Sequence, residues 1–181
     1  MAENTTKQAL VVVDVQVGVM ASSINAAEVI ERIRGLVARA RDRDVPVIWV
    51  RHSSEGLVRE AADWQIVPEL VPAPGEPIVE KTYGDSFAET DLAQRLADAG
   101  ATGFVLCGAQ SDACIRSTFY GGIYRGYPVT LVSDAHTTED LSQWGVEYTP
   151  EQAIAMINTQ AQYTQLPNVS GAVVTADEAF E

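Results

Sequence analysis

Four side chains capable of chemistry stand at the ends of separate apolar segments. Asp14 ends the first segment, His52 follows the second, Lys81 ends the third, and Cys114 opens the helical segment after the fourth. A thiol becomes a nucleophile once it loses its proton, a carboxylate can carry that proton to a leaving amine, and an ammonium group can stabilise the thiolate. Brought together, these groups would suit the hydrolysis of an amide.

Each residue has a plainer interpretation when it is taken alone. An Asp at a strand end is often a turn former, a Lys there is usually a solvated charge, and a lone Cys is more often a small buried hydrophobe. His52 more often makes a local hydrogen bond, and Cys107, inside the run VLCG, is expected to be inert. The joint placement of Asp14, Lys81 and Cys114 is what favours the chemical interpretation.

The sequence around Cys114 predicts an ionised thiol. Residues 108–111 are typical of a turn, and Ser111 is a favourable N-cap, so Cys114 falls in the first turn of a helix. There the helix dipole and the free backbone N–H groups favour a thiolate, and Lys81 would lower the thiol pKa further. The same N–H groups can hold an oxyanion. We expect Cys114 to be ionised at rest, with Asp14 shuttling its proton.

Apolar segments alternate with helical ones, and this order predicts the fold. The expected strands are residues 9–13, 46–50, 78–81, 103–108, 128–133 and 172–175, and the expected helices are 25–42, 90–99, 111–125 and 149–162. The alternation indicates an α/β fold with three layers, α/β/α, and a mostly parallel, doubly wound sheet. Ligands bind at the carboxyl ends of such strands, where the four side chains fall. The long connection 51–77 is expected to shape a binding site.

Two of these helices carry further local signals. In the first, five apolar residues share one face, Asn25 is expected to be the cap, and Glu28 is its capping-box partner. In the second, Leu92 and Leu96 point inward and Gly100 is the stop signal. These apolar faces are predicted to pack on the sheet.

Composition bounds the class of protein. The 181 residues, 46% hydrophobic and 20% charged, fit one soluble globular domain spanning 1–181. A net charge of −13 disfavours nucleic acid and anionic membranes as partners. Two cysteines, no secretory signal and no membrane-spanning run lead us to expect a cytoplasmic protein. Dinucleotide, P-loop and metal-ligand motifs are missing from the sequence, so no cofactor and no metal are expected.

Several stretches together resemble the isochorismatase-like cysteine hydrolases, a group that includes nicotinamidase and N-carbamoylsarcosine amidohydrolase. The stretches are LVVVDVQ at 10–16, VIWVRH at 47–52, VEKTYGDSFAETDL at 79–92 and the Cys-centred segment 104–138. The resemblance implies a Cys114–Asp14–Lys81 triad. It also implies a cis peptide bond between Ala109 and Gln110, which aims the N–H of Gln110 into an oxyanion hole beside that of Cys114.

The sequence also departs from this family's pattern. Gln110 stands where many members have a small apolar residue or Thr, so its amide is expected to face the substrate. Isochorismatase proper lacks the nucleophile, so Cys114 argues against that activity. Val50 precedes His52 where nicotinamidases have the Asp of a metal pair, which disfavours a metal and nicotinamide. His52 is then expected to order the connection 51–77.

The walls of the pocket are predicted from position alone. Gln16 lies two residues after Asp14 and is expected to point to the same side. Trp64, in the long connection, and Tyr83 and Phe87, after Lys81, are expected to line an apolar slot for a small acyl group. The alternative is that Trp64 and Phe87 only pack the connection onto the domain.

We therefore expect a hydrolase that cleaves a C–N bond of a small linear or cyclic amide through a thioester on Cys114, without a cofactor. The alternatives are a non-catalytic binding or regulatory α/β module, a hydrolase of the same fold acting on a non-amide such as isochorismate, and a metal hydrolase using His52, His136 and Asp134. The segment 140–168, with Trp144, Tyr148 and Tyr163, offers apolar surface that one small sheet does not cover, which favours a homo-oligomer, either a dimer or a tetramer. The alternative is an ordinary terminal helix packed on its own domain.

Overall fold

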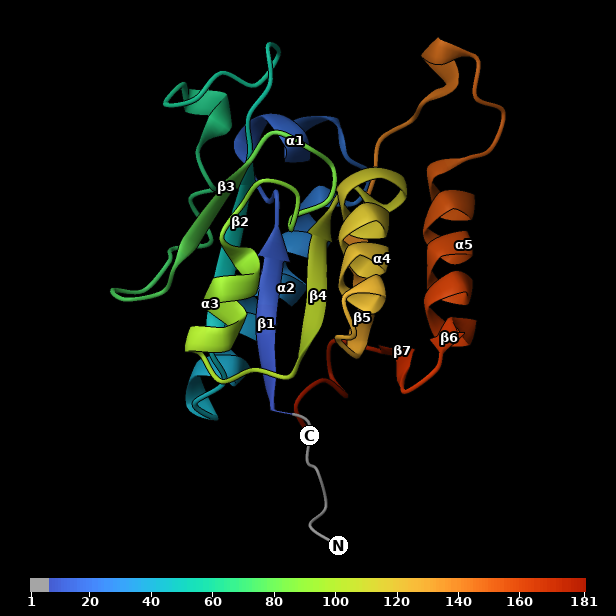
Figure 1. The fold of residues 1–181 in the computed structure, drawn as a ribbon. Helices are drawn as coiled ribbons and strands as arrows, with labels where there is room; N and C mark the ends of the chain where they lie inside the picture. Colours follow the sequence, from blue (N-terminus) through green and yellow to red (C-terminus); the bar gives the residue numbers. More distant parts are fainter. Residues whose placement is uncertain (1–6) are drawn as a thin grey trace, which may run out of the picture.

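A seven-stranded sheet runs through the part of the chain described by the computed structural model, residues 7–181 (Figure 1). Its strands, in spatial order, are β3 (Ile78–Lys81), β2 (Val47–His52), β1 (Gln8–Val13), β4 (Gly103–Ala109), β5 (Val129–Thr137), β7 (Val169–Val174) and β6 (Gln165–Leu166). All neighbours pair in parallel except β6, which forms a short antiparallel pair with β7. The predicted mostly parallel sheet is confirmed.

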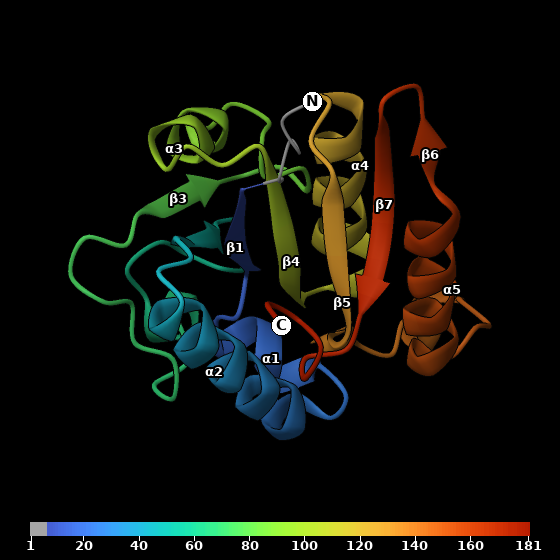
Figure 2. The same ribbon diagram turned by 90° about the horizontal axis from the view of Figure 1, so that it is seen from below.

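Helices cover both faces of the sheet (Figure 2). On one face lie α1 (Val17–Ser22) and α2 (Ala26–Asp42), and on the other lie α3 (Leu92–Asp98), α4 (Arg116–Tyr124) and α5 (Pro150–Tyr163). Each layer encloses its own cluster of buried apolar side chains, which explains why β1 and β4 are apolar on both faces. The three-layer α/β/α architecture predicted from the alternation is confirmed.

Helix α2 forms as its pattern predicts, but it begins differently. The five apolar residues expected on one face are all buried: Val29, Ile33, Leu36, Val37 and Ala40. Asn25, however, adopts a left-handed backbone conformation with φ 51°, and its side chain makes no capping hydrogen bond. Glu28 pairs with Arg32 one turn later. The predicted capping box is therefore wrong, because the partner it needs is engaged along the helix.

The chain leaves the middle of the sheet in both directions. From β1 it moves outward through β2 to β3, and after α3 it returns to β4 on the other side of β1 before moving to β5. The carboxyl ends of β1 and β4 therefore lie side by side at the point where the winding reverses. Crevices at such points are where open α/β sheets bind ligands.

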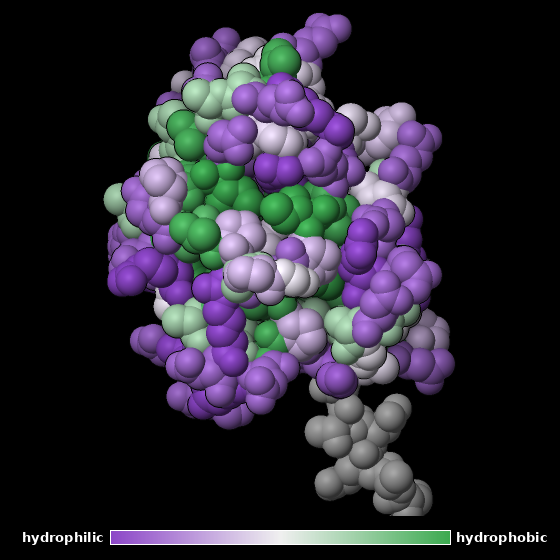
Figure 3. All heavy atoms as spheres, turned by 90° about the vertical axis from the view of Figure 1, so that its left-hand side faces the viewer, coloured by the Kyte–Doolittle hydropathy of each residue, from purple (hydrophilic) through white to green (hydrophobic). Residues whose placement is uncertain are grey.

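The outer edge of the sheet at β3 faces the viewer in Figure 3, where hydrophobic residues gather among polar ones. Val71 and Ile78 are exposed near this edge. β3 itself is only four residues long, which limits the unpaired backbone that the edge presents. Within residues 7–181, no helix is both long and apolar enough to cross a membrane.

Candidate active site

Asp14, Lys81 and Cys114 come together beyond the carboxyl ends of β1, β3 and β4. The Nζ atom of Lys81 lies 2.7 Å from Oδ2 of Asp14 and 3.1 Å from Sγ of Cys114. It also lies 3.2 Å from Nδ1 of His52. The four polar groups that the sequence placed at separate strand ends thus form one cluster, with the ammonium group at its centre.

Backbone geometry places each member of this cluster. Asp14 is the first residue after β1, its φ is 52°, and its N–H donates to the carbonyl of Val50 at 2.9 Å. A left-handed conformation is uncommon outside glycine, and Asp adopts it more readily than most residues. His52 and Lys81 are register partners on β2 and β3, so their side chains emerge side by side.

The turn that carries Cys114 differs from the predicted one. Residues Ser111–Ile115 form one turn of π-helix before α4, and the cap position is Gln110, whose side chain makes no capping hydrogen bond. The peptide bond between Ala109 and Gln110 is cis. The expectation that Ser111 caps this helix is wrong, because its hydroxyl is paired with Nδ1 of His136 at 2.7 Å.

Burial and mutual attraction together set the pKa values of Asp14 and Lys81. Burial raises the pKa of Asp14, and the Lys81 ammonium and its hydrogen bond offset only part of this. For Lys81, burial alone would lower the pKa, but the Asp14 carboxylate and Cys114 together raise it above its ordinary value. The lysine therefore stays charged, and the carboxylate beside it is a stronger base than a solvated one.

The same surroundings keep Cys114 protonated at rest. Burial and, to a smaller extent, the Asp14 carboxylate raise the pKa of the Cys114 thiol to about 12, and Lys81 opposes them only in part. The expectation of a resting thiolate is therefore wrong, since it took account of the cation and the helix start but not of desolvation. Asp14 can accept the thiol proton, because its carboxylate, Cys114 Sγ and a ring nitrogen of His52 all lie within 4.8 Å of one another.

His52 is held as a neutral imidazole. Burial lowers its pKa, and the Lys81 ammonium lowers it further. Because the ammonium can only donate, Nδ1 must accept the hydrogen bond, and the ring proton is on Nε2. The His52 side chain is thus part of the polar cluster around Lys81, whereas it was expected to order the connection 51–77.

Asp14, His52 and Cys114 offer a ligand set that could in principle hold a metal ion. The Lys81 ammonium, however, lies between 2.7 and 3.2 Å from one atom of each of the three. A cation therefore already occupies the centre of the donor set, and a metal there would be repelled by it. The residues present do not fit a metal ion at this place.

The other histidine is committed elsewhere. Its Nε2 lies 2.9 Å from Oδ1 of Asn158, whose Nδ2 donates to the carbonyl of Ser133, so His136 is the donor in the first bond and its Nδ1 accepts from Ser111. Asp134 accepts from the N–H of Ala176. His52, His136 and Asp134 therefore do not converge, and the metal hydrolase built on them is not supported.

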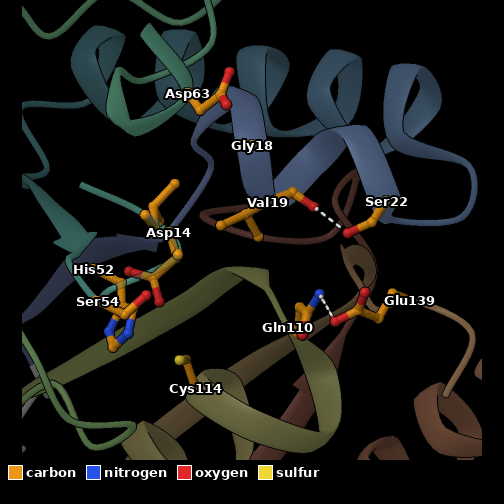
Figure 4. Close-up of a pocket in the computed structure, with 12 residues that line it drawn as sticks. Asp14, Gly18, Val19, Ser22, His52, Ser54, Asp63, Gln110, Cys114 and Glu139 are labelled. Atoms are coloured by element: carbon orange, nitrogen blue, oxygen red, sulfur yellow. Dashed lines mark hydrogen bonds between the residues drawn. The ribbon is translucent and has the colours of Figure 1, made fainter. Parts of the chain in front are cut away.

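A cavity of about 420 Å³ opens above Cys114 (Figure 4). Asp14, His52 and Cys114 line it at the base, and Gln110 lines one side, as expected for a residue facing the substrate. The other lining residues come from α1, from the connection after β2 and from the segment after β5: Gly18, Val19, Ser22, Ser54, Gly56, Leu57, Asp63 and Glu139.

The four predicted wall residues Gln16, Trp64, Tyr83 and Phe87 do not line this cavity. Trp64 is buried, donates from Nε1 to Ser53 at 2.9 Å and packs against the Arg51 guanidinium. Phe87 is buried in an aromatic cluster of the core, and Tyr83 is 51% exposed. Trp64 and Phe87 thus follow the packing alternative.

Gln16 is also turned away from the cavity, and its amide holds the backbone together. Nε2 donates to the carbonyls of Trp64 at 2.7 Å and His52 at 3.0 Å, and Oε1 accepts from the N–H of His52 at 2.8 Å. The side chain is fully buried. Gln16 therefore fastens the end of β2 and the connection 53–77 to the residues after β1.

Position along the chain gave no signal for several wall residues. Gly18, Val19 and Ser22 belong to α1, a six-residue helix too short to show a period. Asp63 sits in a short 3-10 turn, and Glu139 follows β5, which runs beyond the predicted strand. The one available signal was the long connection, which was expected to shape a binding site and which contributes four of the wall residues, Ser54, Gly56, Leu57 and Asp63.

A family model and several known proteins are similar to this chain in sequence. A model of the isochorismatase domain matches residues 8–174. A streptothricin hydrolase of Streptomyces noursei is 36% identical over 140 residues, covering 74% of this chain and 51% of that protein. The ureidoacrylate amidohydrolase RutB of Methylobacterium radiotolerans is 27% identical over 163 residues, covering 72% and 61%. The chain thus spans about half to three-fifths of the length of these relatives.

Among solved structures, a cysteine hydrolase from Pseudomonas syringae pv. phaseolicola superposes with a TM-score of 0.84. The sequences are 23% identical, and the alignment covers 98% of this chain and 96% of the other. At this identity the likeness establishes the shared fold alone.

Proposed function

The chain belongs to the isochorismatase family of hydrolases, and on that premise we propose that it cleaves the C–N bond of a small-molecule amide through a thioester on Cys114. The observation that carries the proposal is the position of Lys81 Nζ, 2.7 Å from Asp14 Oδ2 and 3.1 Å from Cys114 Sγ, at the base of a cavity. A nucleophile, a base and a fixed cation within contact of one another are the groups that acyl transfer requires.

The first step is attack on the amide carbonyl. Because the pKa of Cys114 is raised to about 12, its proton leaves only as the sulfur approaches carbon, and the buried Asp14 carboxylate receives it. Lys81 keeps the carboxylate in place and balances the negative charge that passes from Asp14 to sulfur. The backbone N–H groups of Gln110 and Cys114 are the proposed donors to the oxyanion.

The second half of the reaction returns the proton. The tetrahedral intermediate collapses, the C–N bond breaks, and protonated Asp14 gives its proton to the leaving nitrogen. A thioester remains on Cys114. Asp14 then takes a proton from water, the hydroxide attacks the thioester carbonyl, and the proton goes to sulfur as the acid departs. One amide and one water thus give one carboxylic acid and one amine, and no cofactor is needed.

Three observations favour a C–N bond over other substrates of this fold. The relative RutB is an amidohydrolase by name, and Cys114 is a nucleophile that a vinyl ether cleavage without covalent catalysis would not use. Asp14 is also suitably placed to protonate a leaving nitrogen, because it lines the cavity and its carboxylate lies within 4.8 Å of Cys114 Sγ.

The proposal is tested by trapping the intermediate. The protein is mixed with a panel of small linear and cyclic amides, quenched in acid, and digested for mass spectrometry. The expected result is an acyl group of matching mass on the peptide that contains Cys114, present in Cys107→Ala and absent in Cys114→Ala. Amide hydrolysis that persists in Cys114→Ala contradicts covalent catalysis, and the absence of both adduct and turnover across the panel favours the non-catalytic alternative.

A further inference from the structure

We infer that the amide accepted by this cavity carries a positive charge, an ammonium or guanidinium group, which the carboxylates of Asp63 and Glu139 bind. The inference rests on the proposed function, because it names the class of substrate for the same site. It follows from the charges that line the cavity and from one buried oxygen that lacks a partner.

The lining of the cavity is acidic. Its carboxylates are Asp14, Asp63 and Glu139, and Lys81 neutralises the first of them, which leaves two without a cation. Among the wall residues found within 7–181, none is Lys or Arg. The imidazole of His52 also lines the cavity, but burial and the Lys81 ammonium lower its pKa and keep it neutral. An anionic substrate would therefore meet repulsion that nothing in the wall offsets.

The two uncompensated carboxylates are placed apart on the cavity wall. Figure 4 shows Asp63 beside the start of α1 and Glu139 beside Gln110, with Cys114 below both. Asp63 is exposed, and it packs so closely on Gly18 that a Cβ atom there would lie 3.0 Å from Cβ of Asp63. Glu139 is oriented by Gln110, whose Nε2 donates to Oε1 at 3.0 Å, so Oε2 is left for a ligand.

A second, independent observation indicates what the base of the cavity accepts. Asp14 lines the cavity, and its Oδ1 is buried and has no hydrogen-bond partner in the described part of the chain. A buried oxygen without a donor is costly, so this atom is suited to receive an N–H from the ligand. The cavity thus presents acceptors both at the reacting end and along its walls, which matches a substrate rich in N–H donors.

The charge of the whole chain acts in the same direction. A net charge of −13 makes the surrounding field attractive to cations and repulsive to anions. A negative field of this kind selects between ligands largely by repelling anionic ones. Asp63 and Glu139 would then supply the local contacts that a general field cannot provide.

Charge preference can be measured on Cys114 without any turnover. Three methanethiosulfonates modify thiols by the same chemistry and differ in charge: the trimethylammonioethyl, methyl and sulfonatoethyl reagents. Each labelling rate is divided by the rate with N-acetylcysteine. We expect the cationic reagent to be favoured over the anionic one by about tenfold, and Asp63→Asn or Glu139→Gln to reduce the ratio about threefold each. Asp42→Asn removes an equal charge far from the cavity, at the end of α2, and should leave the ratio unchanged.

Turnover supplies the second measurement. The amides ε-aminocaproamide, heptanamide and adipic acid monoamide have similar length and end in a cation, a methyl group and a carboxylate. We expect kcat/KM to fall in that order. In the Asp63→Asn, Glu139→Gln double variant, the preference for ε-aminocaproamide over heptanamide should be lost. A labelling ratio near one, or equal kcat/KM for the first two amides, overturns the inference while the hydrolase stands. A cationic labelling preference with no hydrolysis of any amide overturns the proposed function instead.

Discussion

Lys81 and Asp14 form an ion pair at 2.7 Å whose side chains are 0% and 2% exposed. Removing two charges from water is expensive, and their mutual attraction recovers the loss only when the geometry is good. The pair is therefore weak evidence for stability but strong evidence for a site, because a fold has little reason to bury these charges beside a thiol unless their interaction is used.

Removing the cation should destabilise the protein and change its response to pH. In Lys81→Met, Asp14 is left buried without a countercharge, and we expect a loss of about 3–5 kcal/mol in the free energy of unfolding near neutral pH. The carboxyl then has a higher pKa in the folded state than in the unfolded state, so the deficit should shrink as pH falls and the group is protonated in both states. Urea unfolding at several pH values measures this. The double variant Asp14→Asn, Lys81→Met should recover most of the loss, and an equal deficit in both variants would show that packing rather than charge is responsible.

Asp14→Asn should move labelling and turnover in opposite directions. Burial and the Asp14 carboxylate both raise the pKa of Cys114, so removing the carboxylate leaves burial alone to oppose Lys81 and lowers that pKa from about 12. Iodoacetamide labelling of Cys114 at pH 8 should then accelerate, by up to about tenfold for each unit of pKa. Turnover should fall by about a hundredfold or more, because the general base is lost.

The matched control for that experiment is Asp42→Asn, which should change neither rate. Cys107 is fully buried, and burial raises its pKa far above the ordinary value, so its labelling should remain slow throughout. A labelling rate that falls together with turnover would show that Asp14 activates the sulfur at rest instead of restraining it.

Gln16→Leu should loosen the cavity without touching the reacting groups. The substitution leaves the N–H of His52 and two carbonyls without the partners that the amide supplies, and we expect a loss of about 1–3 kcal/mol for buried groups left unpaired. Because the connection 53–77 forms part of the wall, KM for the amide should rise more than kcat falls. Hydrogen exchange at His52 and steady-state kinetics measure the two effects. Unchanged exchange at His52 would contradict the role assigned to this side chain.

His136 should make stability depend on mild acid. Burial lowers its pKa below the ordinary 6.5, so in mild acid the unfolded chain binds a proton at this residue and the folded protein does not. Stability is then complete above pH 6.5 and falls as the pH drops below it, with a slope approaching about 1.4 kcal/mol per pH unit. His52 contributes in the same sense. Urea unfolding between pH 5.5 and 8 should show a smaller slope in His136→Gln than in the parent, and equal slopes would refute the assignment.

The clustering of Asp14, Lys81 and Cys114 could be predicted because parallel strands bring their carboxyl ends to one edge. The apolar runs fix the strands, and a residue just past each run must lie at that edge whatever the loops do. The predictions for Gln16 and Ser111 failed because both depend on distant parts of the chain. The direction of Gln16 depends on the connection 53–77, and the Ser111 hydroxyl pairs with His136 instead of capping the helix. The pKa of Cys114 was mispredicted because neighbouring charges can be inferred from sequence, whereas the loss of water around them depends on how the chain packs.

Gly108 at the end of β4 has a consequence for how the spacing of the site is maintained. Its φ is +124°, and a Cβ atom there would lie 2.0 Å from the carbonyl oxygen of Val13, the residue before Asp14. The strand that leads to the acid and the strand that leads to the sulfur are thus in direct main-chain contact, with no room for an intervening methyl group. The gap between base and nucleophile is consequently a property of the scaffold, so alterations of the outer walls can retune what is bound while the reacting pair keeps its separation.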